Sequence, residues 1–311
     1  MKRSKIAVIG AGVAGVGAAR RLVEEGCEVE IFEKSRGFGG RCASRRWEGC
    51  VVDHGAQYWT MRDEVFRTRV QTALFSELGR IRAPILERDQ GRVVEGDHFY
   101  HRSGNSRLVR TLAEGLTVHL ETLVVPKLSS DGRWQVAGKF FDRVIATVPL
   151  PQVKGWFQDC PSNLDSSFAP CLAAWFLFQG QPDGMAQELY AIRPTSTNDL
   201  AWTACENHKE GRVGPEHTLF VAHATEAFSR LFWDEAPELW TQRLLLAVCA
   251  AWEVDSAREM RRGWHRWRYA RAIKRGSTDG LPAGLECVGD GIAGHSRVET
   301  AWLSGYRVEL G

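Results

Sequence analysis

The sequence predicts an α/β protein of two domains, one with a Rossmann-like parallel sheet and a second built on a mixed or antiparallel sheet. Three observations lead to this fold class. An apolar N-terminal stretch runs into the glycine pattern G-x-G-x-x-G at Gly10, Gly12 and Gly15. The same glycine spacing recurs at residues 289–294, close to the C-terminal end. Between the two lie short aromatic segments, "LAAWFLFQ", "LAWTAC" and "TLFVAHAT", with the composition of strands.

The first glycine pattern stands between a predicted strand and a predicted helix. Residues 5–9, "KIAVI", have the composition of a short buried strand. Apolar residues then follow helical spacing over residues 13–25, and Gly26 ends that helix. The alternating segment "CEVEIFE" predicts a second strand that ends at Glu33. Strand, glycine turn, helix and acid-terminated strand form the complete context that a dinucleotide-binding turn requires.

Each part of this turn has a chemical reason. Gly10 permits the tight turn, Gly12 lets the backbone approach a pyrophosphate, and Gly15 lets the helix pack closely on the strand. The free N–H groups and the dipole of the helix start attract phosphates. The Glu33 carboxylate can accept hydrogen bonds from an adenosine ribose.

A second glycine-rich loop follows the acid directly, in "EKSRGFGGRCASRR". An NAD domain has no need of such a loop, whereas FAD has a pyrophosphate that can be contacted from a second side. Arg41 offers a planar fork suited to phosphate. The segment "VVDHGAQYWT" adds a further close-approach glycine, Gly55. These features favour FAD as the cofactor.

Several segments together resemble the flavin amine oxidases, and most closely the renalase-like FAD oxidoreductases of bacteria. They are "FEKSRGFGGR", "DHGAQYWT", "ATVPLPQ", "AWTACENHKEGR", "HRWRYARA" and "GDGIAGHSRVETAWLSG". The N-terminal motifs are shared by many FAD enzymes, whereas "GAQYWT", "HRWRYA" and "VETAWLSG" in combination are far more specific. The resemblance extends from about residue 5 to residue 310.

Motif and resemblance together assign the candidate site residues. Those expected to bind FAD are Gly10, Gly12, Val13, Ala14, Gly15, Glu33, Lys34, Ser35, Gly40, Arg41, Ala56, Gln57, Tyr58, Val125, Asp290, Arg297 and Val298. Those expected to orient the substrate are Tyr58, Trp59, Trp202, His223 and Tyr269. The FAD is expected to be non-covalent, because the cysteine-bearing flavinylation motif of monoamine oxidases is absent. No metal-ligand pattern is present.

The second glycine match has no room for another dinucleotide-binding unit, since 17 residues follow Gly294. The resemblance instead makes this segment the flavin-side element. Asp290 would lie near the ribityl and phosphate groups, and the helix start at Arg297 and Val298 would face the pyrimidine end of the flavin. Thr300 stands where the family often has glycine or asparagine, a change that could alter the backbone approach.

The FAD domain is therefore expected to be discontinuous. It would use residues 1–60, 103–150 and 283–311, and the substrate domain would use residues 61–102 and 151–282.

The central block is expected to hold a helix followed by strands. "SGNSRLVRTLAEGL" predicts the helix, with Asn105 and Ser106 near its cap. "TVHLETLVVPKL", "GRWQVAG" and "FFDRVIATVPL" then predict a β-meander and a strand of the main sheet, with Val125 beside the adenine by resemblance.

The segment at residues 258–275 carries eight basic residues and one acid, interleaved with aromatics. As a strand it would present His265, Trp267 and Tyr269 on one face and Arg266 and Arg268 on the other. Three interpretations stay open: a solvated amphipathic strand, a contact to a phosphate-bearing small substrate, or a nucleic-acid patch.

Composition excludes several classes of function. The net charge of +2 gives no overall field toward nucleic acid or membrane, and no apolar run reaches the length of a membrane span.

The N-terminus resembles a signal peptide in its basic start and apolar stretch. Its four glycines, however, would destabilise the helix that a signal peptide forms. The eight cysteines contain no C-x-x-C pair and are expected to be reduced and mostly buried, as in a cytoplasmic protein. Most of the 12 tryptophans are expected in the core.

The leading hypothesis is a renalase-like oxidase that transfers a hydride from 2- or 6-dihydronicotinamide dinucleotides to FAD, with oxygen as acceptor and hydrogen peroxide as by-product. The alternatives are an amine oxidase or desaturase, and a flavin-binding redox sensor without turnover. A small-molecule partner is expected, a dinucleotide among the candidates, with no nucleic-acid or membrane partner. The sequence predicts no oligomeric state.

Overall fold

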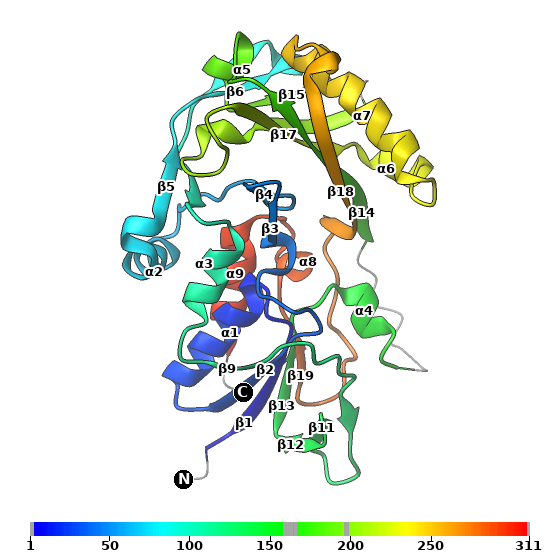
Figure 1. The fold of residues 1–311 in the computed structure, drawn as a ribbon. Coiled ribbons are helices and arrows are strands. Elements are labelled where there is room, and N and C mark those ends of the chain that lie inside the picture. Colours follow the sequence, from blue (N-terminus) through cyan, green and yellow to red (C-terminus); the bar gives the residue numbers. More distant parts are fainter. Residues whose placement is uncertain (1–2, 158–163, 165–166, 196–198, 310–311) are drawn as a thin grey trace.

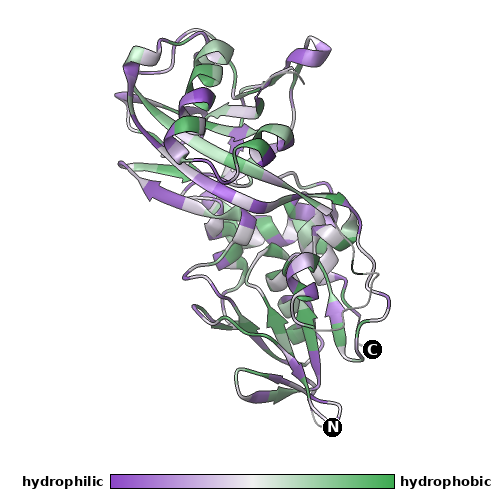
Figure 2. Cartoon of the chain, turned by 90° about the vertical axis from the view of Figure 1, so that its right-hand side faces the viewer, coloured by the Kyte–Doolittle hydropathy of each residue, from purple (hydrophilic) through white to green (hydrophobic). Residues whose placement is uncertain are grey.

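A computed structural model describes residues 3–157, 164, 167–195 and 199–309 of the chain (Figure 1). Its lower part is a five-stranded sheet in the order β19-β13-β1-β2-β9, with every pair parallel. The strands are β1 (Lys5–Ile9), β2 (Glu28–Phe32), β9 (Thr117–His119), β13 (Arg143–Ala146) and β19 (Leu285–Cys287). The expected Rossmann-like sheet is thus confirmed, and it draws strands from the beginning, the middle and the end of the chain. In Figure 2 these strands are mainly green, as buried strands of a parallel sheet should be.

The central block differs in one respect from the predicted meander. Residues Thr117–His119 form β9 and join the parallel sheet, where they pair with β2. The physical reason is the open edge of β2: the pairing completes its ladder and stacks His119 on Phe32, with ring centroids 4.9 Å apart. The antiparallel meander consists of β10 (Lys127–Leu128), β11 (Trp134–Val136) and β12 (Lys139–Phe141).

Helices α1 (Val13–Glu24) and α9 (Val298–Tyr306) pack against each other beside this sheet. Two glycines permit their close approach. A Cβ on Gly17 would lie 2.6 Å from the Trp302 carbonyl oxygen, and one on Gly305 would lie 2.0 Å from the Ala14 carbonyl oxygen. Gly17 of "AGVAGVGAA" in α1 and Gly305 of "WLSG" in α9 are therefore required for helix packing. The remaining helices of the lower part are α2 (Glu64–Leu74), α3 (Ser106–Leu112), α4 (Leu150–Lys154) and α8 (Asp290–Ala293).

The upper part is a seven-stranded sheet in the order β18-β14-β17-β16-β15-β6-β7. It is mixed, since β15 pairs parallel with β6 and the other pairs are antiparallel. The expected mixed or antiparallel second sheet is confirmed. Its strands are β6 (Ile85–Glu87), β7 (Arg92–Val94), β14 (Ser167–Gln179), β15 (Ala191–Arg193), β16 (Leu200–Cys205), β17 (His217–Ala224) and β18 (Glu259–Lys274).

One face of the upper sheet is covered by helices and the other looks toward the lower part (Figure 1). Helices α5 (Met185–Glu188), α6 (Glu226–Leu231) and α7 (Pro237–Trp252) cover the outer face. There Phe176 and Phe220 of the sheet share a buried cluster with Trp240 and Trp252 of α7. The inner face is thereby left to meet the lower domain.

Two antiparallel strand pairs connect the lower and upper parts of the molecule. The pair β3 (Ser44–Trp47) and β4 (Cys50–Asp53) is joined by Glu48 and Gly49, both with positive φ, as a two-residue turn between twisted strands requires. The second pair is β5 (Leu78–Ile81) and β8 (His98–His101). The β3–β4 hairpin lies between the two large sheets and delivers residues 54–57 to the space between them (Figure 1).

Two further expectations from the sequence concern the cysteines and membrane-spanning helices. Seven cysteines are free thiols and five of them are buried, as expected, while Cys160 lies outside the described residues. Within the described part of the chain, no helix combines the length and the apolar character needed to cross a bilayer.

Candidate functional site

A cleft of about 1510 Å³ lies between the two parts of the molecule, and both contribute to its walls. It brings together most of the residues assigned from the sequence. Those that line it are Gly10, Gly12, Val13, Ala14, Glu33, Lys34, Ser35, Gly40, Arg41, Ala56, Trp202, His223, Tyr269, Asp290, Arg297 and Val298. Those that do not line it are Gly15, Gln57, Tyr58, Trp59 and Val125.

The start of α1 is shaped to receive an anion. Gly12 is its N-cap and supplies no side-chain cap, so the first N–H groups of the helix face the cleft without an intrahelical partner. A Cβ on Gly12 would meet no atom of the protein within 4 Å, which leaves the space above the backbone open. Gly15 lies beneath the turn instead: a Cβ there would come within 1.9 Å of the Gly10 carbonyl oxygen. Its role is therefore close packing, as predicted from the motif.

Glu33 closes one end of the cleft. One of its carboxylate oxygens accepts from the Ala11 N–H and the other from the Ser35 N–H, each at 2.8 Å. These bonds fix the carboxylate while each oxygen keeps a second lone pair for a further donor. An uncapped helix start beside a fixed carboxylate fits the pyrophosphate and ribose of a dinucleotide such as FAD.

Arg41 and Asp290 form an ion pair across the cleft. The guanidinium donates to both carboxylate oxygens, with Nη1 at 2.7 Å from Oδ2, and Ser296 adds a hydroxyl donor at 2.5 Å. Burial acts to raise the pKa of Asp290, but the charge and hydrogen bonds of Arg41 and the Ser296 bond together lower it. The fork predicted to hold phosphate thus joins the second glycine loop to the flavin-side element, and its phosphate contact stays a prediction.

The inner face of the upper sheet forms the ceiling of the cleft. Strand register places His265, Ala173, His223 and Trp202 in one row across four adjacent strands. His265, Trp267 and Tyr269 of β18 all line the cleft, as their predicted common face requires. On the opposite face the guanidinium of Arg266 lies over Trp240 and Trp264, as expected. Arg268 was expected on that face too, and its guanidinium lies over Trp233, but the residue also lines the cleft.

The His54 carbonyl ties this ceiling to the loop below it. It accepts from the Trp267 indole N–H at 2.9 Å and from His223 Nε2–H at 3.2 Å. The His54 ring also stacks on Trp267, with centroids 5.3 Å apart, and lies 4.8 Å from the His265 ring. His54 and Trp267 therefore link the lower loop to β18.

The ceiling histidines are neutral at physiological pH. Burial is the main cause and lowers the pKa of His54 to about 3, with smaller contributions from the charges of His265 and Arg45. Burial likewise lowers the pKa of His223 to about 4. The ceiling histidines are therefore uncharged and are poor proton acceptors.

Besides Gly15, four assigned residues lie away from the cleft lining. Gln57 is buried and donates to the Asp53 carbonyl. Trp59 is buried and pairs through its backbone with Phe99. Tyr58 packs against His98, with centroids 4.3 Å apart.

The fourth, Val125, is 48% exposed on the connection between β9 and β10, and Leu120 lines the cleft nearby in the chain. The family resemblance does not indicate the direction in which these four side chains point.

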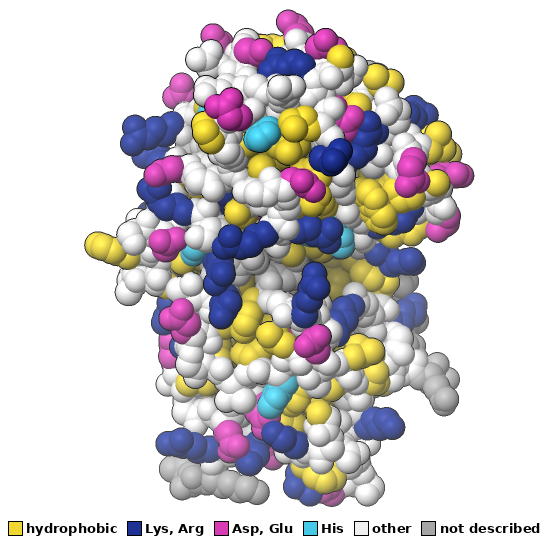
Figure 3. Space-filling model, in the orientation of Figure 1, with side chains coloured by type: hydrophobic (Ala, Val, Ile, Leu, Met, Phe, Trp, Pro, Cys, Tyr) yellow, Lys and Arg dark blue, Asp and Glu magenta, His cyan; other side chains and the backbone are white. Residues whose placement is uncertain are grey.

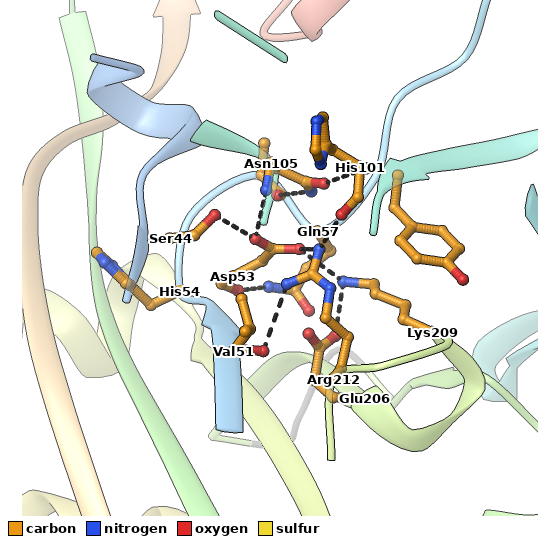
Figure 4. A network of polar contacts seen from close by, with 12 residues as sticks. Ser44, Val51, Asp53, His54, Gln57, His101, Asn105, Glu206, Lys209 and Arg212 are labelled. Carbon is orange, nitrogen blue, oxygen red and sulfur yellow. Dashed lines mark hydrogen bonds and ion pairs between the residues drawn. The ribbon is translucent and has the colours of Figure 1, made fainter. Parts of the chain in front are cut away.

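A buried cluster of four charges supports the site and was not anticipated from the sequence (Figure 4). Asp53 accepts from Arg212 at 2.7 Å and from Lys209 at 3.1 Å, and Lys209 lies 2.7 Å from Glu206. All four side chains are fully buried. Burial alone would raise the pKa of Asp53, but the charges of Arg212 and Lys209 lower it to about 2. "DHGAQYWT" and "ENHKEGR" contain these residues, but no spacing rule links segments about 150 positions apart.

This charge cluster anchors the loop that enters the cleft. Ser44 Oγ and the Asn105 N–H donate to the other oxygen of Asp53, and Asn105 Nδ2 donates to the Ala56 carbonyl at 2.9 Å. The upper domain supplies Glu206, Lys209 and Arg212, whereas Asp53 ends β4. The cluster therefore fixes residues 54–56 relative to both domains.

Comparison with known proteins is consistent with this architecture. The family model described as "NAD(P)-binding Rossmann-like domain" matches residues 8–71. The 4,4'-diapophytoene desaturase of Staphylococcus aureus (strain Newman) is 37% identical over 97 residues, which is 31% of this chain. The chain spans 18% of the length of that relative.

Solved structures match over almost the whole chain. A candidate protoporphyrinogen oxidase from Exiguobacterium sp. 255-15 has a TM-score of 0.79 at 14% identity and covers 98% of both chains. Putrescine oxidase bound to putrescine has a TM-score of 0.75 at 13% identity, with 98% of both chains covered. Reduced UDP-galactopyranose mutase has a TM-score of 0.76 at 12% identity and covers 97% of this chain and 94% of that chain. At such identities the likeness shows the fold alone, and this chain shares that fold with all three proteins.

Proposed function

We propose that the protein is an FAD-dependent oxidoreductase that binds FAD without a covalent bond. The observation that carries this proposal is the single cleft that joins the uncapped start of α1, Glu33 and both glycine loops to the ceiling of β16, β17 and β18. When bound, FAD would supply the acceptor for a hydride. The protein's own residues would hold the cofactor, shield the reacting atoms from water and orient the substrate.

The finer proposal is a renalase-like reaction on 2- or 6-dihydronicotinamide dinucleotides. Loss of a hydride turns such a ring into an aromatic pyridinium, so the step needs no strong general base. A ceiling of neutral, buried histidines and indoles suits this chemistry. With oxygen as final acceptor, the dihydropyridine, oxygen and one proton give the pyridinium and hydrogen peroxide.

Cleft electrostatics favour this reaction over oxidation of a cationic amine. Three carboxylates line the cleft in the described part of the chain, and each is engaged. Glu33 accepts two backbone N–H bonds, Asp290 pairs with Arg41, and Glu226 pairs with Arg230 at 2.9 Å. An ammonium group would find no free carboxylate in the cleft except Glu33, which is assigned to the ribose of the cofactor. The desaturase and amine-oxidase alternatives retain support from the relatives that the chain resembles.

The test is anaerobic reduction of the purified flavoprotein by a panel of candidate substrates. We expect heat-denatured protein to release free FAD, and the 2- and 6-dihydronicotinamide isomers to bleach the flavin faster than ordinary NADH or NADPH. Rapid bleaching by simple amines, without a response to the isomers, would establish the amine-oxidase alternative instead. A protein that cannot be loaded with FAD would contradict the function as a whole.

A further inference from the structure

The cleft carries more positive charge than FAD can balance. Ten basic side chains line it against three carboxylates. In the described part of the chain, nine of them form no ion pair: Lys34, Arg36, Arg45, Arg46, Arg107, Arg110, Arg268, Arg271 and Arg297. Figure 3 shows Lys and Arg side chains, in dark blue, gathered at mid-height on this face of the molecule. FAD brings two phosphates, so most of this charge is left for another ligand.

Part of this charge is concentrated where α3 meets β3. Arg107 and Arg110 are three residues apart on α3 and so project from the same side of the helix. Arg46 comes from β3, and the two elements are joined where the Ser106 N–H donates to Ser44 Oγ at 3.1 Å. Ser103 and Ser106 add hydroxyl groups to the same wall of the cleft.

This group is separate from the pyrophosphate site at the start of α1. Gly39 pairs with Gly12 on one side, and its N–H donates to the Ala11 carbonyl at 3.1 Å. On the other side a Cβ on Gly39 would lie 3.3 Å from the Ser106 Cβ. The turn at Gly39 therefore stands between the α1 start and α3. A phosphate over Gly12 would leave the α3 arginines free.

We infer that Arg46, Arg107 and Arg110, with Ser103 and Ser106, form a second anion subsite that takes a phosphate or diphosphate group of the substrate. Guanidinium forks and hydroxyls are the donors that such groups prefer. That the occupant is a substrate rests on the proposed function. The presence of the subsite rests on the unpaired arginines alone.

The experiment uses flavin-loaded protein titrated calorimetrically with inorganic pyrophosphate. Arg107→Gln/Arg110→Gln is compared with a control that also removes two arginine charges, Arg21→Gln/Arg67→Gln. Both control residues are exposed on helices outside the cleft lining and pair with a glutamate of their own helix. All variants are first checked for FAD content and for thermal unfolding.

We expect pyrophosphate to bind the wild-type holoprotein with an affinity that falls as salt rises. The α3 double variant should bind it at least about tenfold more weakly, because charge-assisted hydrogen bonds are lost, and the control should stay within about threefold. No binding to wild type, equal loss in both variants, or loss of FAD from the α3 variant would each overturn the inference. Failure to load FAD at all would contradict the proposed function instead, so the two failures can be told apart.

Discussion

Single residues in this cleft have separable roles in folding and in cofactor binding. Gly12 and Gly15 belong to one motif, yet the surroundings of their Cα atoms are opposite. The position above Gly12 is open, whereas a Cβ on Gly15 would meet the Gly10 carbonyl at 1.9 Å. The motif thus combines one glycine that leaves open space for a ligand with one required by the fold.

This contrast gives a prediction for alanine at each position. Gly12→Ala should change the free energy of unfolding of the apoprotein by at most about 1 kcal/mol, while FAD affinity falls at least about tenfold. Gly15→Ala should destabilise the apoprotein by about 1–3 kcal/mol or prevent folding. Urea unfolding and FAD titration measure the two effects. The control is Gly214→Ala, which lies outside the cleft lining and whose Cβ would meet only His217 Nδ1, at 3.8 Å. Equal FAD affinity in Gly12→Ala and wild type would place the pyrophosphate elsewhere.

A second residue-scale prediction concerns the buried charge cluster. Asp53→Asn would leave Lys209 and Arg212 fully buried with Glu206 as the remaining counter-charge. We expect the free energy of unfolding to fall by about 3–5 kcal/mol, because an uncompensated buried charge remains. Denaturant titration tests this. The exposed pair of Asp131 and Arg133 provides the control, since Asp131→Asn should leave the free energy of unfolding close to that of wild type.

Among the elements, β18 separates two surfaces by simple alternation. Trp267 faces the cleft and donates to the His54 carbonyl, whereas Trp264 packs on the outer side against Trp240, with ring centroids 5.9 Å apart. The same substitution, tryptophan to phenylalanine, can therefore test each face of the strand separately.

Trp267→Phe should lower the free energy of unfolding by about 0.5–1.5 kcal/mol through loss of one hydrogen bond. It should also shift the visible absorption bands of the bound flavin, because the His54 loop would keep only one of its two hydrogen bonds to the ceiling, the one from His223. Trp264→Phe is the matched control and should leave the flavin spectrum unchanged. An unaltered spectrum in both variants would mean that β18 does not define the flavin environment.

At the scale of the whole molecule, two histidines at the contact between the domains, His54 and His223, make the free energy of unfolding depend on pH. His54 and His223 have folded pKa values of about 3 and about 4, below the ordinary value of 6.5. The unfolded chain therefore binds more protons between pH 6.5 and these values. Their contribution to stability is complete above pH 6.5 and is lost as the pH falls toward 4.

We expect the free energy of unfolding to decrease from pH 7 to pH 4, with His223 contributing up to about 3 kcal/mol of the change. His223→Gln keeps a donor toward the His54 carbonyl but cannot titrate, so its pH profile should be flatter than that of wild type. Denaturant unfolding at several pH values measures the slopes. The exposed His295→Gln should retain the wild-type slope, and a wild-type slope in His223→Gln would refute the argument.

The sequence alone determined the local elements and the cofactor end of the cleft. Glycine spacing, helical periodicity and a terminal acid identified β1, α1 and β2 to within one residue, because these signals act between neighbours in the chain. The alternating faces of β18 were predicted for the same reason. The relation between the last segment and the first glycine loop came from family resemblance rather than from spacing.

Tertiary structure decided what depends on contacts between distant segments. It paired β9 with the open edge of β2, paired Arg41 with Asp290, and turned Tyr58 and Trp59 away from the cleft lining. It also assembled Asp53 with Lys209 and Arg212, about 150 residues away. Side-chain direction after a strand end and the pairing of buried charges depend on packing between domains. A single sequence holds no periodic signal for such contacts, and only the folded chain reveals them.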